Sequence, residues 1–297
     1  MRTSFRRVFA VLAASMAVLI PSAASVAAAP VGQSGDDVSP FIIGGDDAKR
    51  ARSWMASIQL GDRHRCGGEL IRPQWVLTAA HCLVAVKPGE TKVRIGSLDR
   101  TKGGVLVGVK KTKAHPEWIP EGDHNDIAVI QLDRPVWNKP VALSRGLPKA
   151  GTPTRILGWG KDCDSNPDDP ACWKNPVNLQ ELATVVTLAS KCGWFDPKSE
   201  ICTVSRDGQN KQACVGDSGG PQVEEQHGRE VLVGVTRGDG DDGEMRPNVC
   251  TTNPQGGQGA GVWTGVGPHL HVVKKLMRDC GDFDDAEALE RDSRAVA

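Results

Sequence analysis

Short apolar segments separated by turn residues recur along the chain from about residue 54 onward. Several of them alternate apolar and polar positions or are rich in β-branched residues, as half-buried antiparallel strands are. The segments are 54–60, 69–77, 91–95, 104–110, 127–132, 154–157, 182–188, 231–235 and 261–266. Since 34 Gly and 19 Pro in 297 residues supply many chain turns, the pattern predicts an all-β protein.

Helical spacing is convincing in only one segment, residues 268–278. Its apolar side chains fall on one side of a helix, at Leu270, Val273, Leu276 and Met277. Residues 279–297, which follow it, hold seven acids, two Arg and few apolar side chains. We therefore predict one C-terminal helix and interpret 279–297 as an acidic tail without an assigned role.

The first 27 residues have the pattern of an export signal. Arg2, Arg6 and Arg7 precede an uncharged run, 8–20, which is followed by small residues. Such a run is typical of a secretory signal and too short to span a bilayer, with a membrane anchor or buried helix as the alternative. Cleavage after Ala27 would release a secreted, extracellular protein that is free of the membrane and able to form disulfides. The next residues, 28–41, have too few apolar side chains to pack.

The zero net charge of the chain is a cancellation between segments. The whole sequence has 36 Lys or Arg and 36 Asp or Glu, whereas residues 42–278 sum to +4 and residues 279–297 to −5. A composition of 39% hydrophobic and 24% charged residues excludes disorder and a multi-span membrane protein. The lack of a strong positive excess argues against nucleic acid as the main partner.

Three short motifs carry candidate chemistry. His81 precedes the final Cys of LTAAHC, Asp126 opens the apolar run DIAVIQL, and Ser218 stands in GDSGGP. A serine hydroxyl needs a base to become a nucleophile, and an imidazole base needs a carboxylate to fix its tautomer. Glycine allows the sharp turn that an oxyanion hole of backbone N–H groups requires. Each motif alone has an ordinary structural explanation, but together they predict nucleophilic catalysis by serine.

With these motifs, the sequence resembles the chymotrypsin-like (trypsin-family) serine endopeptidases over about residues 42–278. The similarity runs through IIGG at 42–45, CGG at 66–68, WVLTAAHC at 75–82, NDIAVIQL at 125–132, GWG at 158–160 and GDSGGP at 216–221. The resemblance implies two six-stranded antiparallel β-barrels with the site in the cleft between them. His81 and Asp126 would come from the first barrel and Ser218 from the second.

The resemblance also implies a role for each residue. His81 would act as general base, Asp126 would orient it, and Ser218 would attack the scissile carbonyl. The backbone N–H groups of Gly216 and Ser218 would form the oxyanion hole. Substrates would be proteins or peptides, and a proteinaceous inhibitor is a further candidate partner. The resemblance requires no metal or cofactor. The chain is expected to be a monomer. A non-catalytic binding protein that kept the fold is the alternative.

Members of this family are activated by cleavage before an IIGG-like sequence. The freed α-amino group, here that of Ile42, pairs with the acid before the catalytic serine, here Asp217. We therefore interpret residues 28–41 as an activation propeptide and the chain as a zymogen. Because a buried carboxylate is costly without a partner, we expect the Gly216 turn to be badly formed before cleavage. Phe41 precedes the cut, so the activating protease should accept an aromatic residue there, and self-activation is an option.

The residues expected around the substrate's P1 side chain depart from the trypsin pattern. Trypsins place an Asp six residues before the catalytic serine, where this sequence has Gln212. A neutral amide cannot pair with Arg or Lys as a carboxylate does, which predicts a non-tryptic preference. Gly238 and Gly261 would correspond to the two glycines of the pocket wall and leave room for a large side chain.

The chain next to this pocket is unusual in two ways. Segment 234–238 is one residue shorter than usual, which leaves the correspondence of Thr236 and Gly238 open. Acidic residues follow directly, at Asp239, Asp241 and Asp242. Their simplest interpretation is a solvated loop, and trypsin-like cleavage after Arg or Lys through an acidic rim is the alternative.

Nine cysteines leave one without a partner. Export favours disulfides over free thiols, and the resemblance implies Cys66–Cys82, Cys192–Cys202 and Cys214–Cys250, with Cys163–Cys172 as a local pair. Cys280 then remains, and it could be unpaired, bridge two chains or displace an assumed pair. Glu69 stands where the family usually has Ser, a departure that the sequence does not explain.

Overall fold

Fourteen β-strands and two α-helices make up the part of the chain that the computed structural model describes, which is residues 42–119, 124–161, 175–193, 196–239, 250 and 260–294. These residues belong to one unit, Ser39–Ala297. The predicted signal and propeptide, the Cys163–Cys172 pair, and Asp241 and Asp242 lie outside the described residues.

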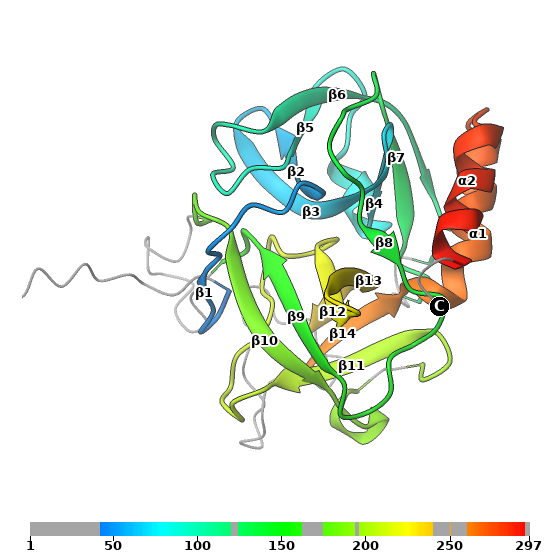
Figure 1. Cartoon of the computed structure of the whole chain (residues 1–297). Coiled ribbons are helices and arrows are strands. Elements are labelled where there is room, and N and C mark those ends of the chain that lie inside the picture. Colours follow the sequence, from blue (N-terminus) through cyan, green and yellow to red (C-terminus); the bar gives the residue numbers. More distant parts are fainter. Residues whose placement is uncertain are drawn as a thin grey trace, which may run out of the picture. The chain divides into compact units, whose positions relative to one another are not determined.

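The first six-stranded barrel is antiparallel throughout and closes on itself (Figure 1). Around the barrel the strands run in the order β2-β3-β4-β7-β6-β5, and β5 pairs with β2. Their bounds are β2 Met55–Leu60, β3 Arg63–Arg72, β4 Trp75–Thr78, β5 Thr91–Ile95, β6 Val105–Ala114 and β7 Ala128–Leu132. Its interior is apolar, since most inward side chains of these strands are Val, Ile, Leu or Trp and are fully buried.

The second barrel has the order β10-β11-β14-β13-β12-β9, closed by pairing of β9 with β10. Its strands are β9 Pro153–Gly158, β10 Gln180–Val186, β11 Glu200–Ser205, β12 Pro221–Gln226, β13 Arg229–Asp239 and β14 Ala260–Gly265. Two short strands add to its sheet, β1 (Asp46–Asp47) beside β10 and β8 (Ala142–Leu143) parallel to β13. The predicted fold of two six-stranded antiparallel barrels is therefore confirmed.

Several strands differ from the sequence prediction, and tertiary pairing explains why. The predicted segment 69–77 is divided by a turn at residues 73–74 into the end of β3 and the start of β4. Strands β11 and β12 were not predicted, and β12 reads PQVEEQ, with little apolar content. Strand β12 forms because β13 and β9 pair with its two edges. Its buried Gln222 donates to the hydroxyls of Thr154 and Thr184.

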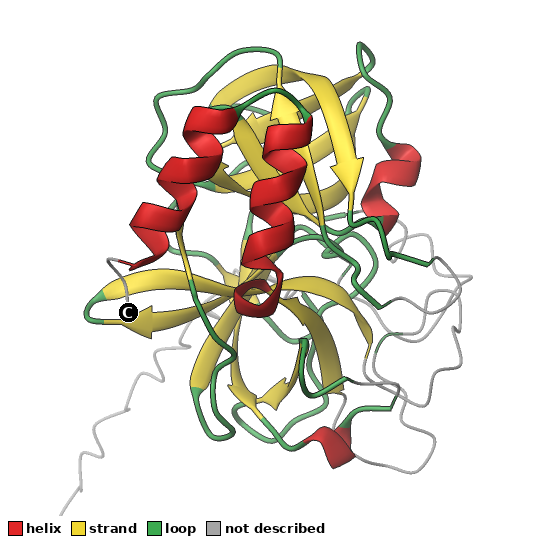
Figure 2. Cartoon of the chain, turned by 90° about the vertical axis from the view of Figure 1, so that its right-hand side faces the viewer, coloured by secondary structure: helices red, strands yellow, loops and turns green. Residues whose placement is uncertain are grey.

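The C-terminal helices lie against the first barrel, as Figures 1 and 2 show. Helix α1 (Val266–Asp279) contains the predicted helix, and its residues contact β7 and β13. A second helix, α2 (Phe283–Arg294), occupies most of the segment interpreted as a tail and packs on α1, β3 and β8. Its sequence has few apolar residues, and among the side chains of α2 whose burial is described, Ala286 and Leu289 join the core.

Polar contacts reinforce the docking of this C-terminal segment. Trp75 Nε1 donates to Asp282 at 2.9 Å, and Arg72 Nε lies 3.3 Å from Asp285 Oδ1. Cys280, between the helices, is buried with a free thiol. No helix in the described ranges combines the length and apolar content needed to cross a membrane.

Candidate active site

His81 and Asp126 form a hydrogen-bonded pair at the edge of the first barrel. His81 begins the short 3₁₀ helix η1 (His81–Ala85), just after β4. Its Nδ1 lies 2.6 Å from Asp126 Oδ2, and its backbone N–H donates to Asp126 Oδ1 at 2.8 Å. Asp126 is fully buried, while about a third of the His81 side chain is exposed. A carboxylate held in this way fixes the imidazole orientation and keeps the proton on Nδ1, which leaves Nε2 to accept a proton.

Asn125 shapes the turn that presents Asp126. Its φ of 57° lies in the left-handed region, and its carbonyl accepts the Ile127 N–H at 2.8 Å. Its side-chain oxygen is 3.1 Å from Nε2 of the buried His269 on α1, whose Nδ1 contacts Gly265 O at 2.7 Å. The sequence analysis missed both residues. Asn directly before Asp126 was an available signal because Asn tolerates this conformation, whereas His269 gave none.

Ser218 stands in a tight turn between β11 and β12. Gly216 and Gly219 on either side of it have φ of 102° and 73°. A Cβ on Gly219 would overlap the side chain of Thr78 and the backbone of Gly67. The Ser218 carbonyl accepts the Gly67 N–H at 2.9 Å, which ties this turn to β3 of the first barrel. Only glycine fits such close approach, so the GDSGGP spacing has a direct steric cause.

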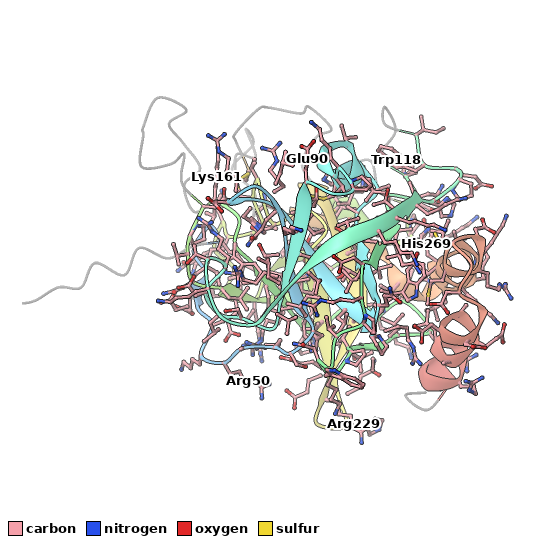
Figure 3. The ribbon with its side chains drawn as sticks, turned by 90° about the horizontal axis from the view of Figure 1, so that it is seen from above. Arg50, Glu90, Trp118, Lys161, Arg229 and His269 are labelled. Atoms are coloured by element: carbon pink, nitrogen blue, oxygen red, sulfur yellow. A yellow bond between two sulfur atoms is a disulfide. The ribbon has the colours of Figure 1, made fainter. Side chains whose placement is uncertain are left out.

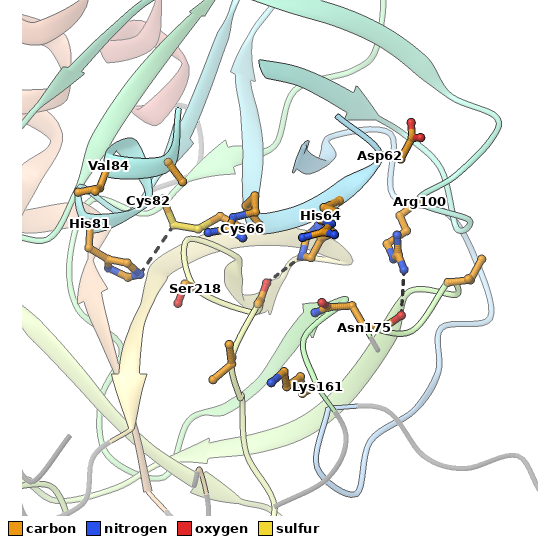
Figure 4. A pocket seen from close by; sticks show the side chains of 16 residues that line it. Asp62, His64, Cys66, His81, Cys82, Val84, Arg100, Lys161, Asn175 and Ser218 are labelled. Atoms are coloured by element: carbon orange, nitrogen blue, oxygen red, sulfur yellow. Dashed lines mark hydrogen bonds between the residues drawn. A yellow bond between two sulfur atoms is a disulfide. The ribbon is translucent and has the colours of Figure 1, made fainter. Parts of the chain in front are cut away.

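Ser218 and His81 line the same open cleft of 1030 Å³ (Figure 4). The Cys66–Cys82 disulfide forms part of its wall, and Cys82 Sγ lies 3.8 Å from His81 Nε2. Two further predicted disulfides, Cys192–Cys202 and Cys214–Cys250, are present in the second barrel. The cleft thus brings together the candidate base and nucleophile from motifs 137 residues apart in the sequence.

Two backbone N–H groups beside Ser218 are available for a ligand. Neither the Gly216 nor the Ser218 N–H has a hydrogen-bond partner within the described ranges. The carbonyl of Gly216 lies 2.8 Å from His64 Nε2, and His64 Nδ1 lies 2.8 Å from Ser57 Oγ. Burial lowers the pKa of His64 to about 4, so this ring is neutral near pH 7 and donates from Nε2. His64, which the sequence analysis also missed, therefore fixes the orientation of the Gly216 peptide.

Asp217 points away from the cleft into the second barrel. Its carboxylate accepts the Gly160 N–H at 2.7 Å and the Cys214 N–H at 2.9 Å. A Cβ on Gly158 or Gly160 would overlap this carboxylate. Burial raises the pKa of Asp217 to about 7, against the smaller effect of the two N–H groups. Backbone hydrogen bonds from Asp217 N–H to Cys214 O and from Gly220 N–H to Asp217 O define this turn in the described structure. The expectation that the turn is badly formed before cleavage stays a prediction.

Ile42 is fully buried in the second barrel. It packs in an apolar cluster with Ala213 and Trp263, among others. Ala213 directly precedes Cys214, whose N–H binds Asp217. The two residues of the predicted activation pair therefore pack against the same short segment.

The three residues predicted to surround P1 lie in the second barrel. Gly238 and Gly261 are on paired strands, with Gly238 opposite Val262 and Gly261 opposite Asp239. Gln212 is 2% exposed, and neither atom of its amide has a hydrogen-bond partner in the described structure. Such an unpaired buried amide can bind a polar group that enters from outside. None of the three is among the described residues that line the cleft around Ser218.

A β-bulge interrupts the strand pairing next to this wall. The pairing of β13 with β14 skips Arg237, from Thr236 opposite Trp263 to Gly238 opposite Val262. The Arg237 side chain lies 3.4 Å from the buried carboxylate of Glu200. Gly238 stays paired on its strand beyond the bulge, which adds a residue to β13 and so does not account for a short segment.

Two polar features of the first barrel have no role in this geometry. Cys66, His81 and Cys82 form the one cluster of metal-ligand type found among the described residues, but the disulfide occupies both sulfurs. Glu69 is fully buried without a hydrogen-bond partner there. Burial raises its pKa well above the usual range, so it is a neutral acid in the core. Nothing in the structure explains why Glu occupies this position.

Comparison with known proteins agrees with this geometry. Residues 42–254 match the family described as Trypsin. The chain is 34% identical to mouse serine protease 56 over 222 residues, which is 71% of this chain but 36% of that protein. It is 33% identical to Drosophila melanogaster trypsin iota over 65% of this chain and 76% of that protein. It thus spans about a third of serine protease 56 and three quarters of trypsin iota.

A solved structure extends the similarity to three dimensions. Neuropsin, described as a serine protease expressed in the limbic system of mouse brain, superposes with a TM-score of 0.65 at 27% identity. The match covers 80% of this chain and all of the neuropsin chain. Since the family match spans well over half of the sequence, the chain belongs to the trypsin family of serine proteases.

Proposed function

We propose that the chain is a secreted serine endopeptidase in which Ser218, His81 and Asp126 form the catalytic triad. The observation that carries the proposal is the buried Asp126 carboxylate bonded to His81 in the cleft that Ser218 lines. Substrates are proteins or peptides, in keeping with the trypsin family.

The geometry supports an acyl-enzyme mechanism. His81 takes the Ser218 hydroxyl proton on Nε2 while Oγ attacks the scissile carbonyl, and Asp126 stabilises the imidazolium. The tetrahedral oxyanion accepts hydrogen bonds from the two unpaired N–H groups of Gly216 and Ser218, worth about 10²–10³ in rate for each donor. His81 then protonates the leaving amine, and water releases the acyl group by the same steps in reverse.

We further propose that the chain is made as an exported precursor. Residues 1–27 act as the signal and residues 28–41 as the propeptide. Cleavage before Ile42 frees an amine that pairs with Asp217, whose pKa of about 7 reflects a buried acid bonded only to backbone N–H groups in the described structure. The new ion pair would ionise Asp217 and lock the Gly216 turn.

The P1 preference is proposed to be non-tryptic. Gln212 offers an amide in place of a carboxylate, and an added Cβ on Gly238 would meet no atom within 4 Å. The Trp263 ring fills the space beside Gly261, so the room lies on the Gly238 side. A side chain that accepts or donates a hydrogen bond therefore suits this wall better than a cation. Peptides that differ only at P1 test the preference, and faster cleavage after Arg or Lys would contradict it.

A fluorophosphonate probe tests the catalytic assignment. Chain cleaved before Ile42 should become covalently labelled, and Ser218→Ala should abolish the labelling. Ser53→Ala is the matched control, since Ser53 is exposed and does not line the cleft. N-terminal sequencing of the labelled protein should begin at Ile42. Absence of labelling in correctly cleaved, folded protein would support a non-catalytic binding function instead.

A further inference from the structure

The cleft around Ser218 extends away from the predicted P1 wall. Its described lining runs from His81 and Ser218 past the Cys66–Cys82 disulfide to Arg63 and Arg100 (Figure 4). The P1 residues Gln212, Gly238 and Gly261 do not line it. With its P1 side chain on that wall and its scissile carbonyl at Ser218, a substrate would have this cleft available for its leaving-group half.

The far half of the cleft is basic. Its described lining contains four basic side chains and one acidic side chain, namely Arg63, Arg65, Arg100, Lys161 and Asp62. Three exposed apolar side chains, Val84, Val177 and Val215, lie in the same lining. Such a mixture of apolar contacts and one sign of charge suits a peptide segment with acidic side chains.

Arg63 and Arg65 are the two basic residues of the lining whose side chains remain available to bind a substrate. They alternate along β3 with the buried His64 and Cys66, so their exposed side chains share one face of the strand. Arg100, by contrast, donates to the carbonyls of Pro176 and Asn175. Neither Arg63 nor Arg65 makes a hydrogen bond or ion pair with any described residue.

The two arginines stand two positions apart on β3, beside the cleft. On a regular strand such residues are about 6.6–6.8 Å apart, and a β-bulge at Arg65 changes the local geometry here. Arg65 neighbours Cys66 of the disulfide beside His81, and Arg63 lies one repeat further from it. A carboxylate two to four residues beyond the scissile bond can therefore reach a guanidinium group.

Resting on the proposed function, we propose that this basic cleft binds the substrate residues C-terminal to the scissile bond, and that Arg63 and Arg65 select acidic side chains at P2′ to P4′. Both groups are solvent-exposed, so each contributes modestly. Together they should favour Glu over Lys by about three- to tenfold in kcat/KM.

Internally quenched peptides with a fixed P4–P1′ sequence test the selection. Glu, Gln or Lys is placed in turn at P2′, P3′ and P4′, and kcat/KM is measured at pH 8 with protein cleaved before Ile42. We expect the order Glu, Gln, Lys at one or more of these positions, with the Glu/Lys ratio falling toward 1 in 1 M NaCl, where the Debye length is about 3 Å. The double variant Arg63→Glu/Arg65→Glu should reverse the order.

A charge change outside the cleft provides the matched control. Arg229 is exposed in the β12–β13 hairpin and does not line the cleft (Figure 3), so Arg229→Glu should leave the Glu/Lys ratio unchanged. The acidic segment 162–174 stays intact in every variant, and its charge is therefore constant. If Arg63→Glu/Arg65→Glu were poorly folded, the milder Arg65→Gln should still lower the ratio.

The outcomes separate this inference from the proposed function. Absence of peptide cleavage and of fluorophosphonate labelling would overturn the proposed function itself. Normal labelling with a Glu/Lys ratio near 1, or a ratio that the cleft variants do not change, would overturn the selection by Arg63 and Arg65 alone.

Discussion

The two barrels hold their parts of the site in different ways. In the first barrel, the buried acid Asp126 is bonded to His81, a group that can carry the compensating charge. In the second barrel, the buried acid Asp217 is bonded to two backbone N–H groups, and its pKa is raised to about 7. The pair of His81 and Asp126 is therefore complete within the chain, whereas the turn that holds Ser218 depends on Asp217, whose charge has no positively charged partner in the described structure.

The interiors of the barrels show the same contrast. The first barrel belongs to one large apolar cluster that also includes residues of α1 and α2. The second barrel divides much of its core between two smaller clusters and buries a hydrogen-bonded group of Thr154, Thr184 and Gln222. The first barrel also buries polar groups, since Ser57, His64 and Gln59 are hydrogen-bonded there, so the two interiors differ in degree. The proposed cleavage before Ile42 would add a charge to the second barrel, where a polar interior can respond to it.

The largest expected loss of activity comes from replacing Asp126, the hydrogen-bond partner of His81. Asp126→Asn should lower kcat of the cleaved protein by about 10⁴-fold, because the amide no longer holds the imidazole in the productive tautomer. Steady-state hydrolysis of a peptide substrate measures the loss. The fold should persist, so circular dichroism serves as the control, and a loss below tenfold would contradict the assigned role of Asp126.

The second largest effect is expected in the pH dependence of the free energy of unfolding of the uncut chain. The raised pKa of Asp217 means that its carboxyl destabilises the folded state progressively as pH rises from 3.8 to about 7, by about 4 kcal/mol, at about 1.4 kcal/mol per pKa unit. Asp217→Asn should remove this part of the slope. Urea unfolding from pH 4 to 8 compares the two proteins. Parallel curves would show that Asp217 does not titrate in this range.

A smaller loss of activity is expected when the same residue is changed in the cleaved protein. Asp217→Asn cannot form the ion pair with the Ile42 amine, so the Gly216 donor should be misplaced, at a cost of about 10²–10³ in kcat/KM. The rate of fluorophosphonate labelling measures this loss. Wild-type activity in this variant would show that the turn around Ser218 does not need the ion pair of Asp217 with the Ile42 amine.

The smallest expected effect concerns the hydrogen bond that joins Trp75 of β4 to Asp282 of the C-terminal segment. Asp282→Ala leaves the buried Trp75 Nε1 without its acceptor and should lower the free energy of unfolding by about 1–3 kcal/mol. Catalysis should change little, since the apolar core still holds β4. Asp284→Ala is the control because Asp284 is exposed. Equal stability of the two variants would mean that the hydrogen bond between Trp75 and Asp282 does not stabilise the fold.

Sequence reasoning succeeded where a local steric or chemical demand leaves few alternatives. Glycine at 219 is required by close backbone contacts, and the apolar run from Ile127 to Leu132 reads as a buried strand. It failed where stability comes from partners distant in sequence. The polar strand β12 depends on pairing with β9 and β13, and α2 depends on the surface offered by α1 and β3.

The sequence by itself determined the strand pattern and the residue types of the candidate triad, because strand periodicity and turn glycines are local properties. Only the tertiary structure decided that Asn125 and His269 shape the turn at Asp126, and that His64 orients the Gly216 peptide. It also decided that Arg63 and Arg65 share the cleft with Ser218. These relations join residues up to 155 positions apart. Because such contacts form only when the two barrels and the C-terminal helices pack together, no local pattern could reveal them.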